Sequence, residues 1–363
     1  MATTNAPSAY LSRPKVLIAG KVNDVLSTDI LTVLVEETIE GLYRCEACFN
    51  NYGKRSDGTG YLYLGRDILD FGKDFAIQLG TSDQTRQVFK GRISGLEAEF
   101  PDGGSGQLIV LAEDRLQDLR MTRRTRAFDD SSDADLMQKI AQEHSLTPDL
   151  DVNGPTYKIV AQVNQSDLAF LRERARSINA EVWVEDTKLL ARTRSGRASS
   201  VGAALDLVYG VNLHAFNVRA DLAHQCTELG VAGWDVAAKS AISETSTASD
   251  ISAELNGDTG GSSILQQAFA ERKERVVHTT PLTSEEARAI AQARYRERAR
   301  RFLTGSGIAD GDARIRVGST LNLAGLGKLF SGKYYVVRVR HTYNVMHGYR
   351  TEFDVERPGL SKP

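Results

Sequence analysis

The chain has 363 residues, of which 41% are hydrophobic and 25% charged, with a formal net charge of −2 and a pI near 6.3. This is an ordinary soluble composition, and it argues against recognition of nucleic acid through overall charge. One core rarely serves so long a chain, so two or three subdomains are expected. The first residues, MATTNAPSAYLSRPK, lack the regions of a secretory signal, and no apolar run approaches a membrane span. We therefore expect the chain to be made and folded in the cytosol.

A first β-domain is predicted over residues 15–127, after an N-terminal arm at residues 1–14. Residues 16–112 consist of short alternating segments such as ILTVLVEE, GLYRCEACF and QLIVLAED, separated by Gly, Asp, Asn and Ser. Alternation with a period of two is typical of half-buried strands, so these residues predict a sheet or a barrel. The sequence PDGGSG at residues 101–106 predicts a hairpin turn, because glycine adopts positive φ readily.

Cys45 and Cys48 form a CxxC pair, a spacing used in zinc sites and in redox chemistry. They lie in a stretch with strand periodicity, where residues three apart point to opposite faces. No second Cys or His pair at ligand spacing exists elsewhere in the sequence. We expect two buried structural thiols and no metal site.

Residues 128–205 predict a smaller helix-plus-hairpin module. Ser132 and Ser166 each precede an amphipathic stretch and are expected to cap a helix. Asn179 is expected to end the second helix, since Asn tolerates the left-handed conformation of C-caps. AEVWVED and KLLAR then predict paired strands. We expect the second helix to act as a wedge between neighbouring domains, with a buried stripe of Leu168, Phe170, Leu171, Ala175 and Ile178.

Strand patterning returns over residues 206–237 and 306–358, which we assign to a second β-domain. Between them, residues 238–305 are expected to hold an insertion: Lys239–Ser263, rich in Ser, Thr, Gly and acids, reads as a mobile loop. A long helix is predicted at Ser284–Leu303, with Thr283 and Glu286 as a capping box. Its inward-facing side chains are expected to be Ile290, Tyr295 and Phe302. Residues 359–363 form a tail.

An internal echo links the two β-domains. Val88–Arg92 reads VFKGR and Leu329–Lys333 reads LFSGK, and each is followed by a strand, a glycine-bearing loop and a closing strand. The shared succession predicts that one small β-domain occurs twice, on either side of the helical module.

No catalytic or cofactor motif is present. The six histidines form no HExxH and no pair at metal spacing within one helix. AGLGK at residues 324–328 lacks the leading glycine and the final Ser or Thr of a phosphate loop, and no GxSxG occurs. His341, on a strand face shared with Val337 and Val339, is expected to be a partly buried hydrogen-bonding residue. We expect no catalytic residue, no metal and no cofactor.

Two basic clusters remain as possible partner-docking surfaces. Neither is interleaved with aromatic residues that would stack on bases, and Glu297 lies within the second, so a solvated face or a protein-docking surface is favoured over phosphate binding. The first cluster is Arg120, Arg123, Arg124 and Arg126, and the second, which also includes Arg294 and Arg296, is represented by Arg298, Arg300 and Arg301.

Several segments, in the same order, resemble the family of phage late control protein D and VgrG-type baseplate hubs. DRLQDLRMTRRTRAF with the Ser-capped helix after it is similar to one family segment, and QSDLAFLRERARSINAEVWVED resembles the family's Ser-Asp-x-x-Phe-Leu helix. STLNLAGLGKLFSGKYYVVRVRHTYN followed by GYRTEF resembles the family's C-terminal strand pair. The matching span runs from about residue 15 to residue 358. The motif residues of that pair are Gly325, Gly327, Gly332, Tyr334, Val337 and His341.

The resemblance implies an α+β, mainly β fold, with two tube-like antiparallel β-barrel domains flanking the smaller module. It implies a non-enzymatic baseplate hub of a contractile phage tail or contractile injection system. Such a homotrimer adapts a sixfold inner tube to a threefold spike and lines a channel for DNA or protein cargo. Its implied partners are a second and third copy, the inner tube protein, a separate spike protein and other baseplate proteins, with no membrane.

Two features depart from the family pattern: Asn179 replaces a common glycine, and the sequence stops without the OB-fold and needle that some hubs carry. The second departure favours a spike made by a separate polypeptide. Two other functions stay open from the residues alone. One is a tail-associated peptidoglycan hydrolase, and the other, weakened by the near-neutral pI, is a barrel that binds nucleic acid through its arginines.

Overall fold

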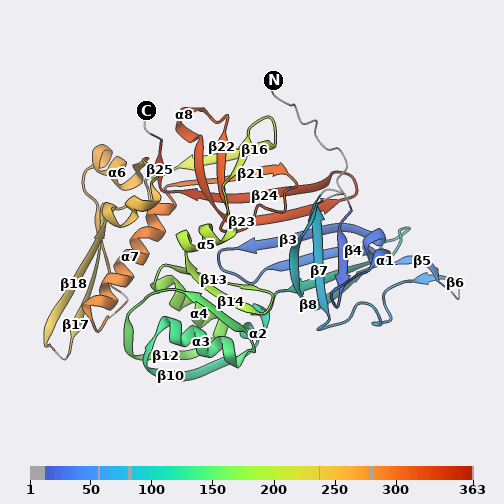
Figure 1. Cartoon of the computed structure of the whole chain (residues 1–363), viewed down its shortest axis with the longest axis horizontal. Coiled ribbons are helices and arrows are strands. Elements are labelled where there is room, and N and C mark those ends of the chain that lie inside the picture. Colours follow the sequence, from blue (N-terminus) through green and yellow to red (C-terminus); the bar gives the residue numbers. More distant parts are fainter. Residues whose placement is uncertain are drawn as a thin grey trace.

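The computed structural model describes residues 13–55, 58–80, 84–236, 238–277, 279 and 281–361. Most of the expected N-terminal arm lies outside these residues, as does His278. The fold is α+β and mainly β, as predicted, and a 13-stranded sheet runs through it (Figure 1). No helix in the described ranges is both long and apolar enough to cross a membrane.

The first β-domain is a curled antiparallel sheet around one hydrophobic core, because alternate residues of its strands are apolar. Phe49, Phe75 and Ile77 are fully buried in that core. The β5–β6 hairpin stands apart as its own two-stranded sheet. The elements are β1 (Lys15–Ile18), β2 (Lys21–Val22), α1 (Asp24–Asp29), β3 (Ile30–Thr38), β4 (Arg44–Asn50), β5 (Tyr52–Arg55), β6 (Gly58–Tyr61), β7 (Asp74–Gly80), β8 (Thr85–Glu99) and β9 (Gln107–Glu113).

The helical module follows, with the predicted helix starts in place. The Ser132 hydroxyl accepts from the Asp135 N–H, and that of Ser166 from the Ala169 N–H. Asn179 has φ of 58° and stands just after the second helix, as expected of a stop residue. The elements are α2 (Leu116–Arg120), β10 (Arg123–Ser132), α3 (Asp133–Glu143), β11 (Thr147–Asp151), β12 (Thr156–Ser166), α4 (Asp167–Ser177), β13 (Ala180–Glu185), β14 (Lys188–Thr193) and α5 (Arg194–Val201).

The stripe on α4 packs mainly within the module, and its role as a wedge between domains stays a prediction. Leu168, Phe170, Leu171, Ala175 and Ile178 are all buried; the buried residues of their core lie within residues 116–191, and Leu42, between β3 and β4, packs against that core. Phe170, for example, stacks on Phe128 of β10 at 5.7 Å between ring centroids. The stripe is the most apolar face of the helix, so most of it covers the module's sheet, while Ala175 also lines the cavity where the domains meet.

The second β-domain repeats the curled sheet around a separate core. Leu303, Leu321 and Val339 are fully buried there. Its elements are β15 (Leu205–Val208), β16 (Leu213–Ala220), β21 (Leu303–Asp310), β22 (Thr320–Ala324), α8 (Gly327–Phe330), β23 (Gly332–Asn344) and β24 (Gly348–Arg357).

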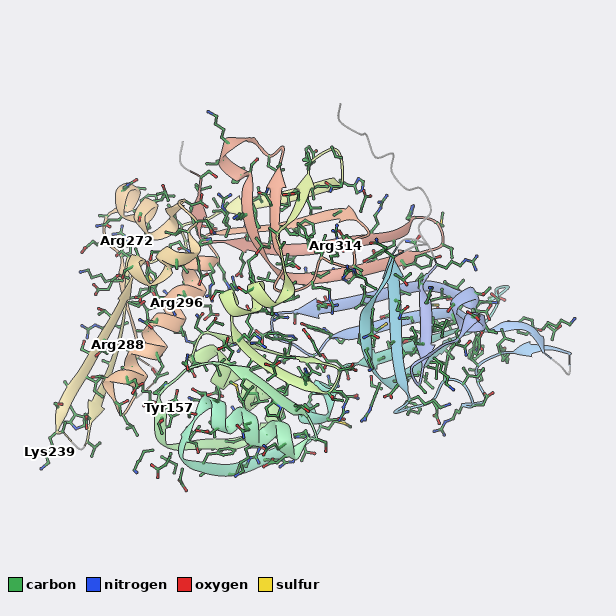
Figure 2. The ribbon with its side chains drawn as sticks, viewed as in Figure 1. Tyr157, Lys239, Arg272, Arg288, Arg296 and Arg314 are labelled. Atoms are coloured by element: carbon green, nitrogen blue, oxygen red, sulfur yellow. The ribbon has the colours of Figure 1, made fainter. Side chains whose placement is uncertain are left out.

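The expected mobile loop is instead folded. Residues 240–247 form a strand because Ile242 and Ser246 alternate with exposed residues, so that one face of the strand is buried. Its sheet is covered by the long helix α7, where Arg288 pairs with Glu244 and Arg296 donates to the Asp250 carbonyl at 2.9 Å (Figures 1 and 2). The elements of this insertion unit are β17 (Glu228–Asp235), β18 (Ser240–Thr247), η1 (Ala248–Glu254), β19 (Thr259–Gly260), α6 (Gly261–Phe269), β20 (Lys273–Val276) and α7 (Ser284–Arg300).

The helix α7 is capped only from one side. The Thr283 hydroxyl accepts from the Glu286 N–H, whereas the Glu286 carboxylate accepts from Leu282 and not from Thr283. Tyr295 faces the unit's core, and Ile290 packs at its margin. Phe302 lies beyond the helix and belongs to the second β-domain's core. The expected C-terminal tail contains strand β25 (Gly359–Leu360), which pairs with β19.

The two β-domains are repeats of one topology. In the first, neighbouring strands follow the order β3-β4-β9-β8-β7, and in the second β16-β21-β24-β23-β22, antiparallel throughout. Both carry two bulges at matching places. The bulge after Ile93 of β8 matches that after Val336 of β23, and the bulge after Ile30 of β3 matches that after Leu213 of β16.

The matched bulges align the two domains differently from the similar segments VFKGR and LFSGK. Aligning Ile93 with Val336 makes Gly91 equivalent to Tyr334, and each of these pairs with the preceding strand, at Phe75 and Leu321. Gly332 is therefore two residues out of register with Gly91. The repeat is present, but VFKGR and LFSGK are not its equivalent segments, since strand pairing and not local sequence sets the register.

Candidate functional site

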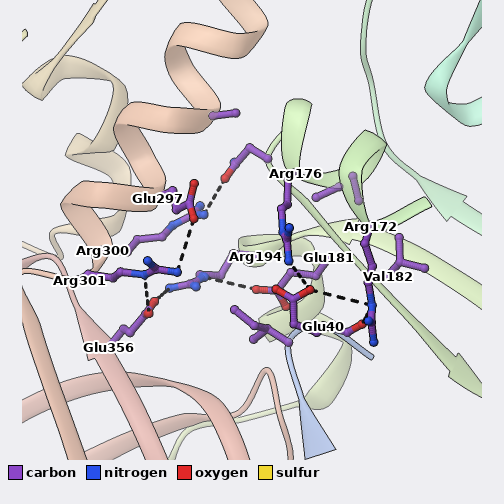
Figure 3. A pocket seen from close by; sticks show the side chains of 15 residues that line it. Glu40, Arg172, Arg176, Glu181, Val182, Arg194, Glu297, Arg300, Arg301 and Glu356 are labelled. Carbon is purple, nitrogen blue, oxygen red and sulfur yellow. Dashed lines mark hydrogen bonds and ion pairs between the residues drawn. The ribbon is translucent and has the colours of Figure 1, made fainter. Parts of the chain in front are cut away.

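A shallow cavity lies where the first β-domain, the module, α7 and β24 meet. Charged side chains from all four converge on it (Figure 3). The residues that line it are Ile39, Glu40, Arg172, Ala175, Arg176, Asn179, Ala180, Glu181, Val182, Arg194, Ala293, Glu297, Arg300, Arg301 and Glu356.

Arg194 is the centre of a buried ion-pair network in this junction. Its Nη1 lies 2.7 Å from Glu356 Oε2, and its Nε lies 3.4 Å from Glu181 Oε1. Arg197, one turn further along α5, donates to Glu181 Oε2 at 2.9 Å. Its guanidinium also stacks on the Trp183 ring, 4.2 Å from the centroid. These contacts fix α5 to the hairpin β13–β14 and to the last long strand.

The charges of this network stabilise each other. Burial by itself would raise the pKa of Glu181, but the guanidinium groups of Arg197 and Arg194 bring that pKa below its ordinary value. Burial would lower the pKa of Arg194, and the carboxylates of Glu356 and Glu181 more than offset it, so that pKa is raised. Glu181 and Arg194 therefore stay ionised in the folded protein. A group held in one charge state is suited to structure and not to proton transfer.

A second set of buried charges joins the two β-domains directly. Glu37 of β3 is 1% exposed; its carboxylate pairs with Arg316 and accepts from the Val317 N–H at 3.2 Å. At the edge of the module, Asp114 accepts from the N–H groups of Tyr43 and Leu116, both at 2.8 Å. Burial raises the pKa of Asp114 to about 7, although these two N–H groups favour the charged form.

The sequence did not single out Arg194, Arg197 or Glu181. The two arginines stand in RTRSGRASS with no acid beside them, and Glu356 is 162 residues from Arg194. A weak signal was available: residues three apart on a helix share one face, which here presents both guanidiniums to one site.

The first basic cluster is paired internally. Arg120 makes two bonds to Glu113, at 2.9 and 2.7 Å, and Arg126 bonds Glu143 and Asp167. Arg124 shares the same two acids, and Arg123 donates to the Asn164 carbonyl. These guanidiniums hold the module together, and a docking surface at these residues stays a prediction.

The second cluster is paired too. Arg298 pairs with Glu274, and Arg300 pairs with Glu254 while donating to the side chain of Asn179. Arg301 lies 3.4 Å from Glu297 and 3.6 Å from Glu356. The arginines attach α7 to the insertion unit, to the module and to β24.

The family-motif residues are structural. Gly325, Gly327 and Gly332 all have positive φ; the first two lie in the connection between β22 and β23, and Gly332 is the first residue of β23. Tyr334 is buried and donates to the Phe330 carbonyl at 2.7 Å. Val337 is not on the buried face, because the bulge after Val336 turns its side chain out of the alternation.

His341 is buried completely, more than the partial burial expected. Its Nδ1 is 2.8 Å from the Tyr349 hydroxyl, and its Nε2 has no partner within the described part of the chain. Burial, with the nearby charge of Arg316, lowers the pKa of His341 to about 3, so the ring is neutral. A neutral, enclosed imidazole is a core residue here.

The cysteine pair lies on β4 as expected, and Cys45 and Cys48 are both buried. Cys48 donates to the Gln107 side chain at 3.1 Å, and burial raises the pKa of both thiols. Over the described ranges, no group of three or more His, Cys, Asp or Glu residues is arranged to hold a metal ion.

The comparisons with known proteins agree with this fold. A 43 kDa tail protein of prophage MuSo2 from Shewanella oneidensis has a TM-score of 0.70 at 12% identity, covering 95% of this chain and 98% of its own. The E. coli c3393 protein, described as a type VI secretion component, gives 0.61 at 12%, over 96% and 79%. A Francisella PdpA–VgrG complex gives 0.56 at 9%, over 97% and 60%.

At such identities these likenesses establish a shared fold, and they confirm at that level the resemblance to tail and VgrG-like hub proteins. Comparison of the sequence with curated proteins finds no match. The model of the family described as Alg8 N-terminal domain matches residues 13–344, which is most of the sequence. The chain therefore belongs to the family of the Alg8 N-terminal domain.

Proposed function

We propose that this chain is a structural baseplate hub of a contractile tail or contractile injection system. Three copies form a ring that adapts a sixfold inner tube to a threefold spike. The observation that carries the proposal is the repeat: one chain holds two like β-domains joined edge to edge, so three copies present six similar domains in a ring. The likeness in fold to tail proteins supports the same reading.

The surface of the continuous sheet suits the lining of a channel. On its open face, a ladder of ion pairs crosses successive strands: Arg44 to Glu36 at 3.2 Å, Glu36 to Arg340 at 3.0 Å, and Arg338 to Asp354 at 2.6 Å. Paired charges favour contact with water and leave little net field to hold a passing chain. DNA or protein cargo would pass without specific binding.

The buried junction suits a rigid adaptor. Arg194, Arg197 and Glu37 tie the module, the two β-domains and β24 together through buried ion pairs. We propose that this network, and not the α4 stripe, sets the angle between domains, while the stripe stabilises the module. The spike, the tube and other baseplate proteins would then dock on a ring of fixed shape.

The proposal is tested on purified full-length protein. Mass photometry should show a particle of about 120 kDa, three times the 39.8 kDa chain, and negative-stain images should show a threefold ring with six densities. Addition of a purified inner tube protein should extend the ring into a tube. A monomer that stays monomeric with tube and spike proteins present would contradict the hub.

The same preparation tests the hydrolase that the sequence left open. The hub predicts no clearing of peptidoglycan. Clearing that disappears when a single carboxylate is replaced would show that the protein is not only a scaffold.

A further inference from the structure

The chain contains one example of how its β-domains join. Strand β23 of the second domain pairs antiparallel with β3 of the first, from Arg338 opposite Thr38 to Asn344 opposite Thr32. The contact is made by the second half of β23, because its first half pairs with β22. This junction makes the sheet continuous across both domains.

The repeat leaves the equivalent edges open at the two outer sides. By the matched bulges, β8 is the counterpart of β23, and β16 is the counterpart of β3. Among the described residues, 95–99 of β8 pair only with β9, and 215–220 of β16 pair only with β21. Unpaired strand edges are templates for another strand.

The register of the observed β23–β3 junction predicts the register of an equivalent junction between β8 and β16. In the chain, His341 lies opposite Val35 and Arg340 opposite Glu36. In the alignment that the bulges give, the counterpart of His341 is Ala98 and the counterpart of Val35 is Val218. The counterpart of Arg340 is Glu97, and that of Glu36 is Arg219.

The two transferred positions also carry opposite charges, but the acid and the base have exchanged strands. Within the chain, Arg340 and Glu36 form an ion pair of 3.0 Å across the junction. At the open edges the acid, Glu97, is on the β8 side and the base, Arg219, is on the β16 side. Both side chains are exposed, and neither has a partner among the described residues. Phe100, one residue beyond the end of β8, is 58% exposed and would meet Phe216.

We propose that residues 95–99 of β8 in one copy pair antiparallel with β16 of the next copy, with Glu97 opposite Arg219 and Ala98 opposite Val218. The occupant of each open edge is thus a second copy of this chain. The contact is heterologous, so it continues from copy to copy and does not stop at a dimer; under the threefold symmetry of the proposed hub it closes a ring. This inference rests on the proposed hub and names the surface that holds its copies together.

A disulfide test reads the register directly. A variant carrying Ala98→Cys and Val218→Cys should form covalent dimers and trimers on mild oxidation with copper phenanthroline, because directly opposite Cβ atoms lie about 4.5–5.5 Å apart. Within one copy the two strands are separated by six intervening strands of the sheet, on the order of 30 Å, so an internal bond is excluded. The single variants are the controls, and the three native thiols are buried.

A charge-exchange series tests the ion pair. Glu97→Arg and Arg219→Glu should each lower the trimer fraction at least threefold at a concentration where the wild type is half assembled. The double exchange in one chain should restore most of it. Glu46→Arg is the matched control, because Glu46 is exposed on β4, an inner strand of the same sheet, and should leave assembly unchanged.

The outcomes separate this inference from the hub. A trimeric wild type, with no crosslink in the double-cysteine variant and equal assembly of all exchange variants, overturns the interface and leaves the trimer intact. A wild type that stays monomeric with tube and spike proteins present, with no crosslink in the double-cysteine variant, overturns both. A crosslinked ring with rescue by the double exchange establishes the β8–β16 contact.

Discussion

Replacing Arg197 by Met should destabilise the junction by about 3 kcal/mol. Arg197 is 1% exposed, donates to Glu181 and Tyr43, and stacks on Trp183. Removing one partner of a buried ion pair costs roughly 3–5 kcal/mol, because the remaining charge stays buried. We expect the lower end of this range, since Arg194 and the Tyr335 hydroxyl still face Glu181.

Urea unfolding followed by tryptophan fluorescence measures this loss. Trp183 is buried against the Arg197 guanidinium, whereas Trp234 is 54% exposed. The Arg197→Met variant and its control are therefore made in a Trp234→Phe background, so that the fluorescence comes from Trp183 at the junction. Adding Glu181→Gln to Arg197→Met should recover part of the stability, because the uncompensated charge is removed.

Arg314→Met is the control for this experiment. Arg314, labelled in Figure 2, pairs with Asp312 at 2.7 Å. Its side chain is 57% exposed, and exposed pairs contribute about 0–1 kcal/mol. Equal losses in Arg197→Met and Arg314→Met would refute the claim that the buried network holds the junction.

Three further results are expected. Leu171→Asp should cost several kcal/mol and prevent assembly, because it buries an unpaired charge in the module's core; a normal far-UV spectrum and a normal trimer would show that this core tolerates it. His341 has a folded pKa of about 3, below its ordinary 6.5, so the unfolded chain takes up the proton first and stability is lost as pH falls from 6.5 toward 3. Relative to His341→Gln, the wild type should lose about 1.4 kcal/mol per pH unit there, and parallel urea-midpoint curves would contradict this. Cys45 should not react with a thiol reagent until urea unfolds the chain, because the side chain is buried and burial raises its pKa; rapid labelling in buffer would show an open strand.

Much of the fold could be predicted from neighbouring residues. Ser132 and Ser166 capped their helices as expected, because a cap depends only on the next three residues. The strand periodicity of residues 16–112 was equally local. The weakest prediction was Lys239–Ser263: its polar composition reads as a loop, but β18 is ordered by pairing with β17 and by cover from α7.

The candidate site was much less predictable. The arginine runs were visible, but Arg126 and Arg300 use their charge inside the molecule, on Asp167 and Glu254, which are 41 and 46 residues away. Exposure and pairing of a charged side chain depend on which segments fold beside it, and no local pattern carries that information.

The sequence by itself determined the periodicity of strands and helices, the helix caps, the absence of any known catalytic motif and the order of the domains. Each of these depends on residues near one another in the chain. Tertiary structure alone decided that the α4 stripe covers the module's own sheet and that Arg194 reaches Glu356. It also revealed the repeat, because equivalence lies in two bulges and a shared strand order and not in shared residues. Strand edges are made of backbone groups that every residue carries, so the edges at β8 and β16 became visible only once the sheet was assembled.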